Sequence, residues 1–226
     1  LVEQCKSDAD AREENRKTPL HYATERGNIE IVKYFVEQCK SDTDQKIEEG
    51  KSLLHYASES GNLETVKYYV EHCHLDANAK EDDGTTPLHY ASKSGNIEIV
   101  KYFIGQCKSD ANAKNDYGKT PLHYASKNGD IEMVKYLVEQ CKSDANEKDD
   151  EGKTPLLNAS ETDKIEVVKY LVEHCKAKVE ATDNLGRTSL HMASLNGRIE
   201  IVKYLVENCR ANVEAKNNDG GTPLHS

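Results

Sequence analysis

Apolar residues recur along the chain at the spacing of short amphipathic helices. In the stretch IEMVKYLVEQC, residues 131–141, four apolar side chains fall on one face at helical spacing: Ile131, Val134, Leu137 and Val138. Asp130, directly before this stretch, is a residue type that caps helix N-termini. The pattern therefore predicts a helix that begins after Asp130 and ends near Cys141.

A second, shorter helix is predicted just before the first. Thr120 is a good N-cap, and Pro121 suits the first helical position, where its missing N–H costs nothing. Gly129 can take the left-handed conformation that ends a helix, so we expect this helix to run to Asn128. The preceding NDYG, residues 115–118, predicts a turn closed by Gly118.

The same unit repeats along the whole chain with a period of 34 residues. Successive cysteines differ by 34 (39 − 5 = 34), and they stand at Cys5, Cys39, Cys73, Cys107, Cys141, Cys175 and Cys209. The motif TPLHYA follows the same period at residues 18–23, 86–91 and 120–125, with variants in the other copies. No copy gains or loses a residue, which predicts one array over residues 1–226 and not two domains.

A single helix pair of this size cannot bury its own apolar face, whereas stacked copies can. The expected fold is therefore an all-α solenoid with six complete helix pairs. The full repeats are 11–44, 45–78, 79–112, 113–146, 147–180 and 181–214, with the end of a preceding repeat at 1–10 and the start of a further one at 215–226.

The repeated pattern D/N-x-x-G-x-T-P-L-H-x-A, followed by G-N-x-E-I-V, resembles the ankyrin repeat over essentially the whole chain. The other helical repeat of this period, the tetratricopeptide type, lacks support because its Trp, Gly and Tyr pattern is missing. The resemblance implies antiparallel helix pairs joined by β-turn fingers. It also implies a protein-interaction module without enzymatic activity.

The array departs from the usual repeat at the end of the second helix. The period is 34 residues and not ~33, and none of the thirteen glycines stands at this exit. We place the extra residue in the CKSDAN segment and expect a longer last helical turn there.

Histidine and cysteine recur once per repeat, which raises the alternative of a metal or redox protein. By resemblance, the histidines bond to the turn of the neighbouring repeat, and helices ~8–10 Å apart cannot easily share an ion bound at ~2 Å. Neighbouring cysteines should lie beyond disulfide reach, so all seven are predicted to be reduced and the inner ones mostly buried. The HCH at 72–74 is a poor metal site because adjacent helical residues point apart.

Lysine and tyrosine also recur once per repeat. Each lysine of the second helix follows a glutamate three residues earlier, so the row is interpreted as solvated ion pairs. The tyrosine row is interpreted as packing. There is no Gly-rich phosphate loop and no unique constellation of catalytic residues. The sequence therefore predicts no catalytic residue, no cofactor and no metal.

Composition narrows the class of partner. The net charge is −10, no Lys/Arg block appears, and no stretch approaches the ~20 apolar residues of a membrane span. We therefore expect no nucleic acid and no membrane insertion, and a protein partner that offers a basic or extended segment with apolar anchors. Unpaired cysteines suggest an intracellular, cytoplasmic location. We also expect a monomer.

Function should lie at positions that differ between copies. By resemblance, the turn tips and the ends of the first helices line a concave face, and the tips are mostly acidic, from Glu13 and Glu14 onward. Tyr117, Leu185 and Leu195 are apolar exceptions. The predicted partner-binding residues are Asp82, Asp83, Lys93, Asp116, Tyr117, Lys119, Lys127, Asn128, Asp150, Glu151, Asn184, Leu185, Arg187, Leu195 and Asn196.

Two further points stay open. The fifth repeat is the least regular, with Leu157 and Asn158 in place of His-Tyr and Asp163–Lys164 in place of Gly-Asn. This irregularity indicates either drift or a local groove for a partner. The array could also be the recognition or spacer arm of a larger protein, such as an enzyme or a channel.

Overall fold

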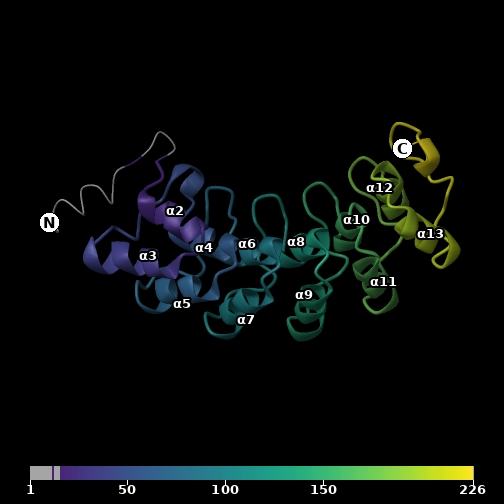
Figure 1. The fold of residues 1–226 in the computed structure, drawn as a ribbon. Helices are drawn as coiled ribbons and strands as arrows, with labels where there is room; N and C mark the ends of the chain where they lie inside the picture. Colours follow the sequence, from purple (N-terminus) through teal and green to yellow (C-terminus); the bar gives the residue numbers. More distant parts are fainter. Residues whose placement is uncertain (1–11, 13–15, 226) are drawn as a thin grey trace. The chain divides into compact units, whose positions relative to one another are not determined.

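A computed structural model describes residue 12 and residues 16–225 of the chain. It falls into two compact units, residues 1–110 (unit 1) and 111–226 (unit 2), and each is described by itself. The described residues form helices and no strands (Figure 1). Unit 1 contains α2 (Pro19–Glu25), α3 (Ile29–Lys33), α4 (Leu53–Ser60), α5 (Leu63–Glu71), α6 (Pro87–Ser94) and α7 (Ile97–Gly105). Unit 2 contains α8 (Pro121–Asn128), α9 (Ile131–Lys135), α10 (Pro155–Ser160), α11 (Ile165–Glu173), α12 (Ser189–Leu195) and α13 (Ile199–Glu207).

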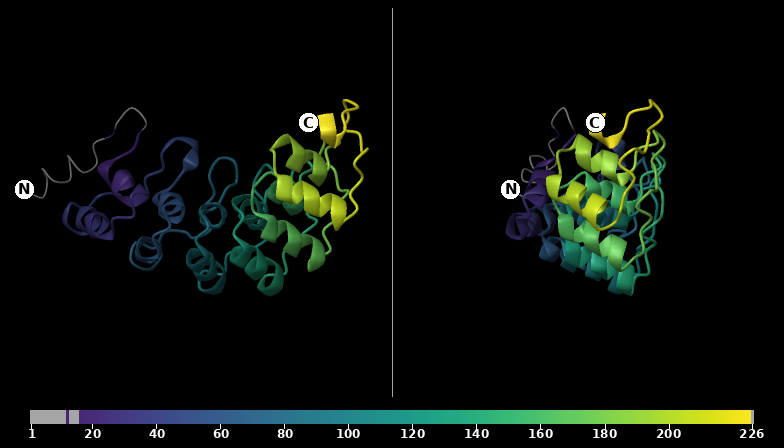
Figure 2. Two further views of the ribbon diagram at one scale, coloured as in Figure 1. Left: turned by 45° about the vertical axis from the view of Figure 1, so that its right-hand side comes forward. Right: turned by 90° about the vertical axis from the view of Figure 1, so that its right-hand side faces the viewer.

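Each repeat contributes one short first helix and one second helix, as the repeat period predicts. In unit 2, the first helices α8, α10 and α12 pack side by side, and α11 packs against both α9 and α13. The finger loops lie on one side of these helix pairs (Figure 2). The core lies between the pairs, where Leu122, Val134 and Leu137 are fully buried. The expected solenoid of stacked helix pairs is confirmed.

The first helices begin as the sequence predicts. Pro121 is the first residue of α8, and the histidine two positions later turns back onto the cap. His123 Nδ1 accepts from the backbone N–H of Thr120 at 3.2 Å and lies 2.8 Å from the Thr120 hydroxyl. At the other end, Gly129 takes a φ of 80°, which ends α8 in the left-handed conformation. Asp130 then caps α9 by accepting from the backbone of Met133.

The second helices end in a wide turn that needs no glycine. After α7, the N–H of Cys107 bonds to the carbonyl of Tyr102, five residues back, and that of Ser109 bonds to Phe103, six residues back. Lys108, between them, has a φ of 57°. Equivalent residues with positive φ follow the other second helices: Lys40, His74, Lys142, Lys176 and Arg210. A turn of this width takes up one residue more than an α-helical turn, so the expected longer last turn is confirmed.

The fifth repeat departs from its neighbours where its sequence does. Its first helix, α10, ends at Ser160, and the residue that follows, Glu161, is right-handed, whereas a left-handed glycine ends α8. Leu157 is fully buried at the histidine position. Asp163, which replaces that glycine, forms an ion pair of 2.6 Å with Arg198 of the next repeat. The substitutions thus shorten the helix and tie it to its neighbour.

Candidate functional site

The finger tips and the ends of the first helices of unit 2 form one surface, which we name the finger face. Three large apolar side chains stand exposed on it. Tyr117 and Leu185 are each 54% exposed at the tips of their fingers, and Leu195, the last residue of α12, is 55% exposed. Their exposure follows the sequence prediction.

Backbone hydrogen bonds join successive fingers into a row. The N–H of Asp150 donates to the carbonyl of Tyr117 at 3.0 Å, and that of Asn184 donates to Glu151 at 2.8 Å. The N–H of Asn218 continues the row by donating to Leu185 at 2.9 Å. Because the tips are fixed by their main chains, the side chains on them are held in register.

A chain of ion pairs crosses the finger face. Glu151 lies 3.4 Å from Lys119 and 3.2 Å from Lys153, and Lys153 lies 3.0 Å from Glu161. Glu161 also pairs with Lys127 at 3.4 Å. The hydrogen bond from Lys153 lowers the pKa of Glu151 below its usual value, so this carboxylate stays ionised. Most of the acidic charge of this finger is therefore already balanced by lysine.

Sequence comparison between copies missed two members of this network, Lys153 and Glu161. The signal was present, because a basic residue recurs before the TPLH motif at Lys17, Lys51, Lys119, Lys153 and Arg187. Only the structure shows that Lys119 reaches the next finger and that Lys17, Lys51 and Lys153 reach the ends of the first helices. Arg187 pairs with Asp183 of its own finger.

Some of the other predicted residues of unit 2 are exposed without an ion pair, and others hold the fingers together. Asp116 and Asp150 are exposed and form no ion pair within the described residues. Asn184 and Arg187 support the fingers, since Asn184 donates to the carbonyl of Asp150 at 2.7 Å and Arg187 pairs with Asp183 at 2.7 Å. Asn128 and Asn196 lie exposed at the ends of first helices, and Asn196 donates to the carbonyl of Met192.

The remaining predicted residues lie in unit 1. The N–H of Asp82 donates to Glu49 at 2.9 Å, and Asp83 accepts from the N–H of Thr85 at 2.9 Å. Lys93 lies 3.7 Å from Glu59. The sequence prediction grouped these three residues with those of unit 2. The structure places Asp82 and Asp83 on the third finger and Lys93 on α6, and the grouping stays a prediction.

Lysines and tyrosines alternate beside these residues in unit 1. Lys17 lies 5.5 Å from the ring centroid of Tyr22 and 4.9 Å from that of Tyr56. Lys51 lies 4.5 Å from the centroid of Tyr56 and 4.1 Å from that of Tyr90. Cation–π contacts therefore link the first helices of successive repeats.

The third repeat carries an unusual buried carboxyl group. Glu81 stands where the later fingers have Asn or Asp, and it is 9% exposed. One oxygen accepts from the hydroxyl of Tyr90 at 3.1 Å, and Oε1 has no hydrogen-bond partner. Burial raises the pKa of Glu81 to about 7.

The histidine row is structural, as the resemblance implies. His55 Nε2 lies 3.2 Å from the carbonyl of Thr85, and His191 Nε2 lies 3.1 Å from that of Gly221. Each carbonyl belongs to the turn of the following repeat. Among the described residues, no group of three or more His, Cys, Asp or Glu side chains could hold a metal ion.

The tyrosines of the second helices connect neighbouring repeats. The hydroxyl of Tyr170 donates to Glu139 of the preceding repeat at 2.8 Å, and Tyr204 donates to Glu173 in the same way. Equivalent bonds in unit 1 join Tyr68 to Glu37 and Tyr102 to Glu71. The row is therefore more than packing.

Replacing Tyr170 by phenylalanine removes one such inter-repeat bond and little volume. We expect a loss of about 1 kcal/mol in the free energy of unfolding, measured by urea denaturation. Tyr117→Phe is the matched control, because this hydroxyl stands at an exposed finger tip. Equal losses in the two variants would contradict a special role for the Tyr170 bond.

The cysteines correct one prediction. Cys39 is disulfide-bonded, so the prediction that all seven thiols are reduced is wrong. Five others are free: Cys73, Cys107, Cys141, Cys175 and Cys209. These five are partly buried, and Cys39, which lies in an equivalent wide turn, is fully buried. Cys5, with Glu13 and Glu14, lies outside the described residues, and the intracellular location stays a prediction.

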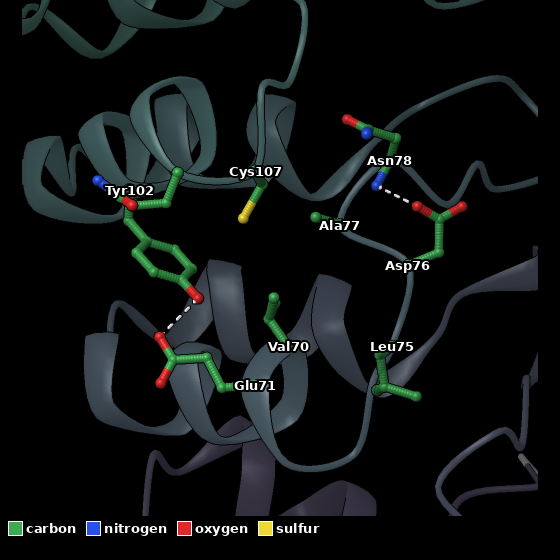
Figure 3. A pocket seen from close by; sticks show the side chains of 9 residues that line it. Val70, Glu71, Leu75, Asp76, Ala77, Asn78, Tyr102 and Cys107 are labelled. Atoms are coloured by element: carbon green, nitrogen blue, oxygen red, sulfur yellow. Dashed lines mark hydrogen bonds between the residues drawn. The ribbon is translucent and has the colours of Figure 1, made fainter.

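A groove of about 480 Å³ lies beside one of these cysteines in unit 1 (Figure 3). Its walls are the end of α5, the end of α7 and the loop at residues 75–78. Cys107 and Ala77 face each other across it, and Tyr102 donates to Glu71 at 2.9 Å along one side. Burial raises the pKa of the Cys107 thiol above its usual value. The groove therefore offers no activated nucleophile.

The fold and the repeated finger face define a helical repeat protein of the ankyrin type. The family model for ankyrin repeats matches the chain in three copies, at residues 1–80, 54–149 and 141–217. The chain belongs to the ankyrin repeat family. A comparison with curated proteins gives no match. Ankyrin repeats are generally protein-interaction modules, and this family is typically non-enzymatic. None of the described helices is long and apolar enough to cross a membrane.

Proposed function

We propose that this chain is a non-enzymatic interaction scaffold and that the finger face of unit 2 binds its protein partner. One observation carries the proposal. Tyr117 and Leu185 stand exposed at tip positions where other fingers have Glu49, Asp83 or Glu151, so the fold does not need apolar side chains there. Large exposed apolar groups held on a rigid row are typical of binding surfaces.

The partner we propose is a protein segment with apolar anchors and basic residues. Apolar groups would cover Tyr117, Leu185 and Leu195. The basic residues would face Asp116 and Asp150, since the carboxylate of Glu151 is already shared by two lysines. If the array is one arm of a larger protein, the same face would recruit the substrate or regulator of that protein.

The test is affinity capture with the whole chain and a variant carrying Tyr117→Ala, Leu185→Ala and Leu195→Ala. We expect the variant to lose specific partners, with each binding at least about tenfold more weakly. The matched control removes lysines from the outer side of the second helices, with Lys135→Ala, Lys169→Ala and Lys203→Ala. Partners that bind all three proteins equally, at equal thermal stability, would reject the finger face.

A further inference from the structure

We propose that the finger face reads an extended peptide in which two apolar residues stand six positions apart, with basic residues between them. This inference rests on the proposed function and specifies its ligand. Tyr117 would hold the first apolar residue and Leu185 the second. The ligand is thus a linear segment of another protein, and the finger face recognises it by the spacing of its two apolar residues.

The two anchors occupy equivalent places in equivalent turns. Each is followed by a glycine with positive φ, 69° at Gly118 and 74° at Gly186. Each also offers its backbone carbonyl to the next finger, at 3.0 Å from Tyr117 and 2.9 Å from Leu185. Equivalent backbone geometry directs the two side chains the same way.

The distance between the anchors follows from the repeat. Packed helices lie ~8–10 Å apart, so two repeats separate the anchors by roughly 18 Å. A polyproline II chain rises ~3.1 Å per residue and spans about 19 Å in six residues. Its period of three residues puts positions one, four and seven on one side, so each of three successive fingers meets one residue. An α-helix rises only ~1.5 Å per residue, so a helical ligand would need about twelve residues for the same distance.

The finger between the anchors carries charge and not apolar surface. Glu151 is exposed there, with Lys119 and Lys153 beneath it at 3.4 and 3.2 Å. An apolar residue at the middle position would bury this ion triplet without compensation. Asp116 and Asp150 stand beside the anchor row without an ion pair in the described chain, so basic residues complement it. The charges therefore favour apolar residues at the two ends only.

The experiment uses fluorescein-labelled peptides of one composition, with two leucines and two lysines in a serine and proline background. The leucines stand three, six or nine residues apart. Binding to the full chain is measured by fluorescence anisotropy. We expect the peptide with a spacing of six to bind about tenfold more tightly than the other two. Tyr117→Ala together with Leu185→Ala should abolish that preference.

Moving an anchor gives the sharpest test. The double variant Glu151→Leu and Leu185→Glu keeps the composition of the fingers but brings the two apolar tips one repeat apart. Both positions are exposed, and far-UV circular dichroism with thermal melting checks the fold. The preferred spacing should change from six to three residues.

The possible outcomes separate this inference from the proposed function. Peptides that bind without regard to spacing, or a preference that does not move with the anchor, would overturn the spacing rule. In that case, loss of binding in the alanine variant would still support the finger face. If no peptide binds and the alanine variant keeps every captured partner, both proposals are wrong.

Discussion

Replacing His55 by glutamine is expected to make the free energy of unfolding about 2 kcal/mol less sensitive to acidification from pH 7.5 to pH 5. Burial lowers the pKa of His55 from 6.5 to about 4, and that of His21 likewise to about 4. In this window, the unfolded chain binds protons that the folded chain does not. Stability therefore falls as the pH falls from 6.5 towards 4, and each such histidine adds to the loss.

The hydrogen bonds of His55 explain why the neutral ring is favoured. Its Nδ1 accepts from the backbone N–H of Ser52 at 3.2 Å, so Nε2 carries the proton and faces the carbonyl of Thr85. A second proton on Nδ1 would point at a donor. The ring is fully buried, so the added charge would also lie away from water.

The measurement is urea denaturation at a series of pH values, which gives the number of protons bound on unfolding. At pH 5.5, the His55→Gln chain should take up about one proton fewer on unfolding than the parent chain does. His74→Gln is the matched control, because His74 is exposed and lies outside the histidine row. An unchanged proton count in His55→Gln would show that this ring is not the acid-sensitive group.

Glu81 acts in the opposite direction and serves as an internal check. Its pKa is raised from 4.5 to about 7, so the folded chain holds a proton that the unfolded chain loses between these values. This carboxyl group lowers stability as the pH rises through that window. Glu81→Gln should therefore stabilise the chain by roughly 2–3 kcal/mol at pH 7.5 and leave it more sensitive to acid.

Much of the fold could be predicted because the same residue types set the helix boundaries in most copies. Thr120 with Pro121 starts a helix, Gly129 ends it and Asp130 caps the next one, all through local hydrogen bonds. The exit of the second helix could not be built in the same way. Lys108 has no intrinsic preference for a positive φ, and only the bonds that close the turn around it impose that conformation.

The candidate site was predictable only in part. Exposure of Tyr117 and Leu185 followed from comparing copies, since apolar residues at turn tips have nothing to pack against. The ion network was missed because its geometry depends on which way long side chains cross between repeats. Lys153 contacts both Glu151 and Glu161, on different elements, and no local pattern encodes that choice. The partner-binding role of the residues stays a prediction.

Gly152→Ala is expected to destabilise unit 2 by about 3 kcal/mol. Gly152 has a φ of 76°, which costs an alanine about 1–2 kcal/mol by itself. The added Cβ would also lie 2.9 Å from the backbone N of Asn184 and 2.5 Å from its Oδ1. The backbone atom cannot move away without breaking the bond from Asn184 to Glu151, so the row of fingers would open there.

Alanine variants of two other glycines measure the free-energy cost of a positive φ without the cost of a close contact. Gly220 occupies the same place in the last finger with a φ of 80°, and Gly197 has a φ of 66° within a full repeat. A Cβ at either would meet nothing within 4 Å. Alanine at these positions should cost only about 1–2 kcal/mol in urea denaturation. If Gly152→Ala costs no more than Gly197→Ala, close contact between fingers does not hold the row together, and the rigid register that the peptide proposal needs is lost.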